Sequence, residues 1–138
     1  MSVVRGEREE TKLTVVEQAE ELAGYTLKMA TNEKRFPKRY RWCFTSKLCD
    51  TALELTEIVH EANGICAKSK SDMKLRLRYE LMAIAKVNGL LDLISVGAKV
   101  YGISLDNIEY WLDKTTYERT LLIKWRESDR ERLGGLPD

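Results

Sequence analysis

Hydrophobic residues recur every three or four positions through most of the chain, the spacing of an α-helix that buries one face. No segment shows the sustained two-residue alternation that is typical of a half-buried strand. The pattern therefore predicts an all-α protein, with helices over residues 13–32, 38–63, 72–101 and 104–132.

The clearest apolar stripe lies in the second of these segments. Leu48, Ala52, Leu55, Val59 and Ala62 alternate spacings of four and three residues, which resembles a coiled-coil seam. The other predicted stripes are Val16, Ala19, Leu22 with Ala23, Leu27 and Ala30 in the first segment, Leu77, Leu81, Ile84, Asn88, Leu91, Ile94, Ala98 and Tyr101 in the third, and Ile108, Leu112, Thr115, Leu122 and Trp125 in the fourth.

Residues that start or stop helices stand between the stripes. Pro37 is expected to open the second helix, because proline is tolerated in the first helical turn and disfavoured inside. Asn63 and Gly64 tolerate a left-handed backbone and are expected to end that helix. Ser71 or Asp72 would then cap the third helix.

The connections between the predicted helices are short, and short connections favour antiparallel neighbours. The last one is a turn from Gly102 to Ser104, with Ser104 as the cap of the fourth helix. A chain of 138 residues fits one domain. We expect an antiparallel up-down-up-down four-helix bundle over 13–132, with a flexible N-terminal arm at 1–12 and a flexible tail at 133–138.

Few residues could build a catalytic or metal site. Cys43, Cys49 and Cys66 form no C-x-x-C pair, and we expect buried free thiols. A di-metal bundle needs Glu-x-x-His pairs from two helices, whereas Glu57 and the single histidine, His60, supply one. Phosphate-binding, dinucleotide-binding and nucleophile-elbow motifs are absent from the sequence. We expect no catalytic residue, no metal, no cofactor and no enzymatic activity.

The sequence also favours a cytoplasmic protein. No uninterrupted apolar run approaches the roughly 20 residues that cross a bilayer. The N-terminal segment is polar and acidic, unlike a secretory signal. We therefore expect neither secretion nor a membrane partner.

The net charge is only +1, but the charges are segregated along the chain. Between residues 28 and 49 every charged residue except Glu33 is basic, and between 68 and 78 every one except Asp72 is. Such local clusters are typical of polyanion binding. The predicted nucleic-acid-binding residues are Lys34, Arg35, Lys38, Arg39, Arg41 and Lys47, the first basic block, and Lys68, Lys70, Lys74, Arg76 and Arg78, the second basic block.

Aromatic residues interleave the first basic block. Phe36, Tyr40 and Trp42 could stack on unpaired bases while the cations neutralise phosphates. The alternative is a solvated helix start, in which the three rings anchor the turn against neighbouring helices. In an antiparallel bundle the two basic blocks would lie at opposite ends, so they would form one patch only along a side or in an oligomer.

Large apolar residues outside the predicted stripes indicate self-association. A four-helix bundle buries one stripe per helix, so further apolar surface is typical of an interface. The residues that predict a homo-oligomer are Tyr25, Ile58, Met82, Leu90, Trp111, Tyr117 and Leu121.

Several of these segments resemble a bacterial family of four-helix-bundle proteins. They are the run Arg35-Phe-Pro-Lys-Arg-Tyr-Arg-Trp, Leu48 with Ala52-Leu-Glu-Leu and Glu61-Ala-Asn, the Gly102-Ile-Ser turn, and Trp125 in Leu-Ile-Lys-Trp-Arg. The family includes the ribosomal RNA intervening-sequence proteins and the accessory variability determinant (Avd) of diversity-generating retroelements. The resemblance spans 13–132.

The resemblance implies a non-enzymatic, ring-shaped homo-oligomer, a five-fold barrel (homopentamer) in the accessory proteins. Their basic surface contacts RNA, DNA and the element's reverse transcriptase, in support of mutagenic cDNA synthesis. Arg39 and Tyr40 stand where the family often has an acidic residue, which favours polyanion binding. The N-terminal arm and the basic segment favour the accessory branch; the alternative is an intervening-sequence-type scaffold without nucleic-acid binding.

Overall fold

The protein is built from four long α-helices. The computed structural model describes residues 5–138, with side chains from Thr14 onward. The helices are α1 (Arg5–Ala30), α2 (Ser46–Gly64), α3 (Lys70–Tyr101) and α4 (Leu105–Leu133), and residues 5–138 contain no strand. The predicted all-α class is therefore confirmed.

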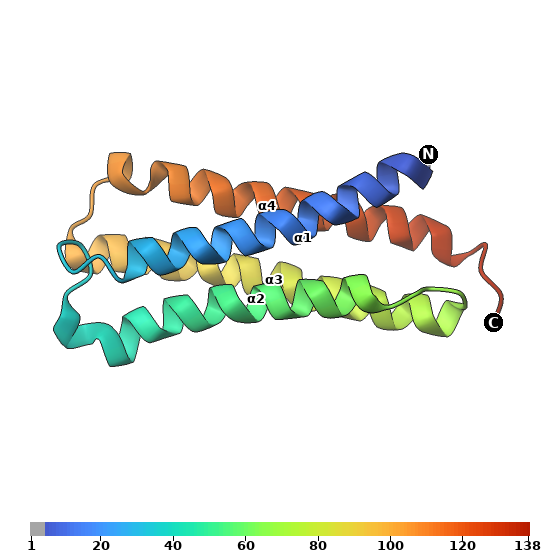
Figure 1. Ribbon diagram of the computed structural model, residues 1–138, viewed down its shortest axis with the longest axis horizontal. Coiled ribbons are helices and arrows are strands. Elements are labelled where there is room, and N and C mark those ends of the chain that lie inside the picture. Colours follow the sequence, from blue (N-terminus) through green and yellow to red (C-terminus); the bar gives the residue numbers. More distant parts are fainter. Residues whose placement is uncertain (1–4) are drawn as a thin grey trace.

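The helices lie side by side as an elongated bundle (Figure 1). The α1–α2 and α3–α4 connections lie at one end, which we call the tip. The α2–α3 connection lies at the opposite end, as do the C-terminus and the start of α1. Both α1 and α3 pack against α2 and α4, so the helices surround a single core.

The core confirms the α2 stripe at every position. Leu48, Ala52, Leu55, Val59 and Ala62 are all buried, none more than 1% exposed. Each of these positions is apolar, so the sequence pattern and the buried face coincide.

The predicted stripe of α1 is right in part. Ala19, Leu22, Ala23 and Ala30 are buried, whereas Val15 is buried in place of Val16, which like Leu27 is only partly covered.

The predicted stripe of α3 is right in part, since Leu77, Ile94 and Ala98 are buried. Leu81 is 51% exposed and Asn88 is exposed, whereas Arg76 and Glu80 face the core. Two ionisable side chains therefore occupy core positions, and a stripe drawn through apolar residues alone misses them. The buried positions of α3 are Met73, Arg76, Leu77, Glu80, Ala83, Val87, Leu90, Ile94, Gly97 and Ala98.

In α4 the prediction is right at four of its positions and omits others. Leu112 is only partly covered, and Trp111, absent from the predicted stripe, is fully buried. The Trp111 indole N–H donates to the buried Thr26 hydroxyl at 3.0 Å, so its polar atom is satisfied inside the core. Leu90, Trp111 and Leu121, predicted as surplus apolar surface, are core residues, while Met82 and Tyr117 remain exposed.

Of three predicted helix boundaries, one is wrong and two are confirmed in position. Ser69, not Ser71 or Asp72, caps α3, in a reciprocal capping box with Asp72. α2 ends at Gly64 without a left-handed residue; the positive φ in the described chain is at Gly102, which ends α3 (φ 66°). Ser104 caps α4 by position, but its side chain makes no capping hydrogen bond.

Both predicted flexible ends are more ordered than expected. α1 begins at Arg5, so residues 5–12 of the predicted arm are helical, and residues 1–4 lie outside the described chain. In the tail, the Pro137 carbonyl accepts a hydrogen bond from the Lys70 N–H at 2.8 Å, and the Lys70 ammonium lies 3.4 Å from Asp138. The C-terminal tail therefore contacts Lys70, the first residue of α3.

α3 is the one described helix that is long and apolar enough to cross a membrane, and 28% of its apolar window is buried inside the bundle. Core helices of bundles pass the same test, so the expectation of no membrane partner stays a prediction.

Candidate nucleic-acid interface

The first basic block folds into a compact elbow at the tip. The Asn32 carbonyl accepts hydrogen bonds from the N–H groups of Arg35 and Phe36, at 3.1 and 2.9 Å. Pro37 then precedes a 3₁₀ turn, Lys38–Tyr40, and a π-helical turn, Arg41–Thr45, before α2 begins. The prediction of one continuous helix over 38–63 opened by Pro37 is therefore wrong for its first eight residues.

Buried aromatic rings hold this elbow against the bundle. Phe36 is 2% exposed and stacks on Phe44, with ring centroids 6.3 Å apart. It also meets Tyr101 and Trp111 edge to face, at 5.8 and 6.0 Å. Phe36 is thus an anchor of the turn, as the alternative interpretation expects.

Gly97 of α3 makes room for this aromatic cluster. A Cβ atom at Gly97 would lie 2.7 Å from Phe44 Cε1 and 3.2 Å from Phe36 Cε1, closer than packed carbon atoms approach. Sequence analysis did not single out Gly97, although a glycine inside a helix signals close packing.

Tyr40 and Trp42 behave differently from Phe36. Tyr40 is 37% exposed and stacks on Tyr101 with centroids 5.7 Å apart, while the Arg39 guanidinium carbon lies 4.9 Å from its ring centre. The Trp42 side chain is 81% exposed. The rings of Tyr40 and Trp42 are therefore open to solvent among cations, the arrangement that stacking on unpaired bases needs.

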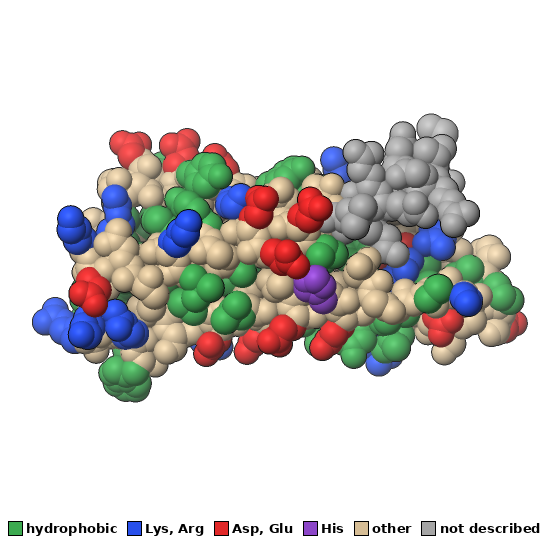
Figure 2. All heavy atoms as spheres, in the orientation of Figure 1, with side chains coloured by type: hydrophobic (Ala, Val, Ile, Leu, Met, Phe, Trp, Pro, Cys, Tyr) green, Lys and Arg blue, Asp and Glu red, His purple; other side chains and the backbone are tan. Residues whose placement is uncertain are grey.

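The cations of the first basic block are open to solvent. Lys and Arg side chains gather over the tip, at the left of the molecule in Figure 2. Arg35 is half-buried and the other five are exposed. Among the described residues, Arg41 alone of this block has an ion-pair partner, Glu33 at 3.0 Å, and that pair is itself exposed. Most of the positive charge is therefore available to a ligand.

Two pockets adjoin at the tip and share Lys34, Arg35 and Tyr101. The larger, of 530 Å³, adds Arg39 and Tyr40 to this lining, together with apolar side chains. The smaller, of 260 Å³, is more polar and is completed by the turn between α3 and α4. Burial raises the pKa of the Tyr101 hydroxyl above its ordinary value.

The second basic block lies at the opposite end of the bundle and is divided. Lys68, Lys74 and Arg78 are exposed, whereas the ammonium of Lys70 pairs with the tail. Arg76 is 2% exposed. The structure therefore does not bring the two blocks together, and Arg76 does not belong to a binding surface.

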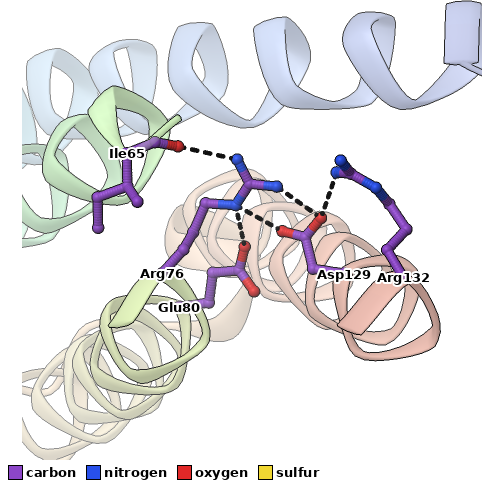
Figure 3. Close-up of polar contacts among 5 residues, drawn as sticks. All are labelled: Ile65, Arg76, Glu80, Asp129 and Arg132. Atoms are coloured by element: carbon purple, nitrogen blue, oxygen red, sulfur yellow. Dashed lines mark hydrogen bonds and ion pairs between the residues drawn. The ribbon is translucent and has the colours of Figure 1, made fainter. Parts of the chain in front are cut away.

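Arg76 instead ties three elements together inside the bundle (Figure 3). Its Nε and Nη2 atoms donate to the two Asp129 carboxylate oxygens at 3.0 and 2.9 Å, a bidentate pair between α3 and α4. Its Nη1 donates to the Ile65 carbonyl at 3.0 Å, which fixes the α2–α3 connection. Arg132 reaches the same Asp129 carboxylate at 3.3 Å.

Two glutamates are buried in the same core. Glu80 lies 3.9 Å from Arg76, yet burial and the adjacent Asp129 carboxylate raise its pKa to about 10. Burial raises the pKa of Glu118 to about 9, and neither of its carboxyl oxygens has a hydrogen-bond partner among the described residues. Both glutamates are neutral acids at pH 7.

The remaining candidates for chemistry give no site in the described part of the chain. His60 pairs with Glu20 of α1 at 2.9 Å on the surface rather than acting with Glu57. Between residues 14 and 138, no three His, Cys, Asp or Glu side chains come close enough to hold a metal ion. The expectation of buried thiols is wrong, because Cys43 and Cys66 are exposed and Cys49 is partly covered.

Comparison with known proteins adds no identification. No family model, no curated protein and no solved structure matches this chain. The resemblance to the accessory and intervening-sequence proteins therefore stays a prediction.

Proposed function

We propose that this chain is a non-enzymatic nucleic-acid-binding accessory protein of a diversity-generating retroelement, which brings a reverse transcriptase and its template RNA together. One observation carries the nucleic-acid part: the exposed cations of the first basic block surround exposed aromatic rings and two pockets at the tip. Cations supply affinity for phosphates and flat rings supply affinity for bases.

The rival function is an intervening-sequence-type scaffold without a nucleic-acid role. It expects the first basic block to pair with Asp50, Glu54, Glu57 or Glu61 of a neighbouring copy. Glu54 already pairs with Lys86 of its own chain at 2.6 Å, and this pair lowers the Glu54 pKa. One of the four acids that the scaffold would use is thereby engaged within the chain, which favours the binding function.

We infer that the helices form the antiparallel up-down-up-down bundle predicted above and that copies assemble into a ring, with a pentamer favoured by the resemblance. An apolar groove of 530 Å³ between α2 and α3 supports self-association. Met82, Ala85, Gly89, Leu93 and Val96 line it from α3 at helical spacings of three and four residues, a second stripe outside the core.

Light scattering tests the assembly. A mass that is a multiple of 15.9 kDa at micromolar concentration is expected. Replacing Val96 with Glu should lower that mass, since a charge would then lie in the apolar groove. A monomer mass for the wild-type chain would overturn the oligomer.

The nucleic-acid function is tested by the salt dependence of binding to a labelled single-stranded RNA. Three phosphate contacts give a slope of about −2 in log affinity against log salt concentration, because each contact releases counterions. Absence of binding at low salt would overturn the function.

Copurification with the reverse transcriptase of the same element tests the bridging role. Recovery that survives nuclease supports direct protein contact, and recovery that nuclease abolishes supports an RNA bridge. Recovery of neither enzyme nor RNA would leave the scaffold as the better function.

A further inference from the structure

We propose that the tip is a site for unpaired nucleotides, in which bases stack on Trp42 and Tyr40 while Lys34, Arg35 and Arg39 hold the phosphates. This inference rests on the proposed nucleic-acid function and names its substrate: single strands or unpaired loops in preference to duplex.

The exposure of Trp42 is the first observation. Tryptophan is highly buried on average, and Trp111 and Trp125 are, at 0% and 2% exposure, whereas Trp42 is 81% exposed. It lies in the π-helical turn Arg41–Thr45, and such turns are frequent at functional sites. An indole held open beside Arg41 gives a base a surface on which to stack.

The flat groups around Tyr40 are the second observation. Tyr101 stacks on Tyr40 and the Arg39 guanidinium lies over the same ring, so Tyr40 contacts two other planar groups. Bases stack on aromatic rings and on guanidinium planes alike. Tyr101 in turn packs against Phe36 and Phe44, so the platform is joined to the buried aromatic cluster of the elbow.

The two adjoining pockets are the third observation. The larger has a wall of Pro37, Tyr40 and Val100 beside Arg39, which suits a base next to a phosphate. The smaller offers Ser104 and Asn107 beside the shared Lys34 and Arg35, which suits the next phosphate or sugar. The shared cations therefore lie between positions for consecutive nucleotides.

A duplex would use only part of this site. Its bases already stack on one another, so their faces are not accessible to Trp42 or Tyr40. Duplex binding would depend on the cations alone, and the structure therefore predicts that single strands bind more tightly than duplex at equal salt.

Abasic strands separate stacking from phosphate binding. Fluorescence anisotropy would compare a labelled single strand, an abasic strand of the same length and the matching duplex, with the full-length protein. One stacked base raises affinity about 5- to 150-fold. We expect the abasic strand and the duplex to bind at least fivefold more weakly than the single strand.

Variants locate the stacking surface. Trp42→Ala should remove most of the difference between the normal and abasic strands, and Trp42→Phe should restore much of it because it returns a ring. Tyr117→Ala, which removes an exposed ring of α4, is the matched control and should change nothing. Circular dichroism of each variant confirms that the helices are retained.

The outcomes distinguish this inference from the proposed function. Equal affinity for normal and abasic strands, with both binding well, would overturn stacking and leave the nucleic-acid function standing. Stacking on these rings would also be overturned, with the nucleic-acid function left standing, if Trp42→Ala and Tyr40→Ala both retain the full difference in affinity between the normal and abasic strands. Failure of every strand to bind at low salt would overturn the function and this inference together.

Discussion

The two ends of the bundle carry similar basic sequences and use them in opposite ways. At the tip, Arg39 lies on the surface over the Tyr40 ring. At the other end, Arg76 is buried, with its guanidinium bound by Asp129 of α4 and by the Ile65 carbonyl. Arg39 is therefore available to a ligand, whereas the guanidinium of Arg76 is used in hydrogen bonds within the bundle.

The difference teaches that local charge alone does not identify a binding surface. Asp129 stands 53 residues after Arg76, so the partner that neutralises this arginine is invisible in the segment from 68 to 78. The tip has no such partner from another helix among the described residues; its one ion pair joins Arg41 to Glu33, eight residues away.

Replacing Arg76 with Ala tests the buried end of the bundle and has the largest expected loss of stability. The Asp129 carboxylate would then lie inside the bundle without its main partner, which costs about 3–5 kcal/mol. Urea unfolding followed by circular dichroism measures the loss. Arg39→Ala at the tip is the matched control, with an expected change within about 0.5 kcal/mol. Equal losses for the two variants would contradict the distinction between the ends.

Replacing Glu118 with Gln removes a buried ionisable group. The folded pKa of about 9 lies above the unfolded value of 4.5, so the folded state holds a proton that unfolding releases between these pH values. Stability conferred by that proton is complete below pH 4.5 and declines as pH rises toward 9, by roughly 1 kcal/mol per pH unit.

Glu118→Gln should therefore flatten the fall in unfolding free energy between pH 5 and pH 9, and gain about 3–5 kcal/mol over the wild type at pH 8. Residual pH dependence should persist, because Glu80 also has a raised pKa. Glu20→Gln, which alters an exposed carboxylate, is the control. An unchanged pH profile in Glu118→Gln would show that the group is not a buried neutral acid.

Replacing Gly97 with Ala tests how closely α3 packs against the aromatic rings at the tip. The added methyl group would press on Phe44 and Phe36, which costs about 1–2 kcal/mol and displaces the elbow that carries Trp42. Gly24→Ala, which meets no atom within 4 Å, should instead gain about 0.5–1 kcal/mol. Thermal unfolding compares the two, and a gain in both would contradict the close contact.

The sequence predicted those parts of the fold whose core positions are apolar. The α2 stripe was recovered completely because all five of its residues are aliphatic. The α3 stripe was not, because two ionisable side chains occupy core positions: Arg76 is paired with Asp129 of α4, and Glu80 is held there as a neutral acid. Pairings between distant helices leave no periodic signal.

The candidate site was predictable in composition and not in geometry. The alternation of cations and aromatic residues predicted a binding segment, which lies at the tip. Nothing in the spacing of these residues distinguished the buried Phe36 from the exposed Trp42. A 3₁₀ turn and a π-helical turn lie between Phe36 and α2, so the two rings reach different environments. Phe36 fits inside the bundle because Gly97, sixty-one residues later, has no side chain. Such contacts arise only once the helices pack.

The most direct test compares two triple variants, one at each end, for affinity to a single-stranded RNA across a range of salt concentrations. Lys34, Arg35 and Arg39, the cations proposed to hold the phosphates, become Gln in the first variant, and three exposed cations of the second basic block become Gln in its match. Those three are Lys68, Lys74 and Arg78. If the tip is the interface, the first variant binds much more weakly and its salt slope flattens by about 2, while the second retains the wild-type slope. A wild-type slope in the first variant, or equal losses in both, would contradict the assignment of binding to the tip.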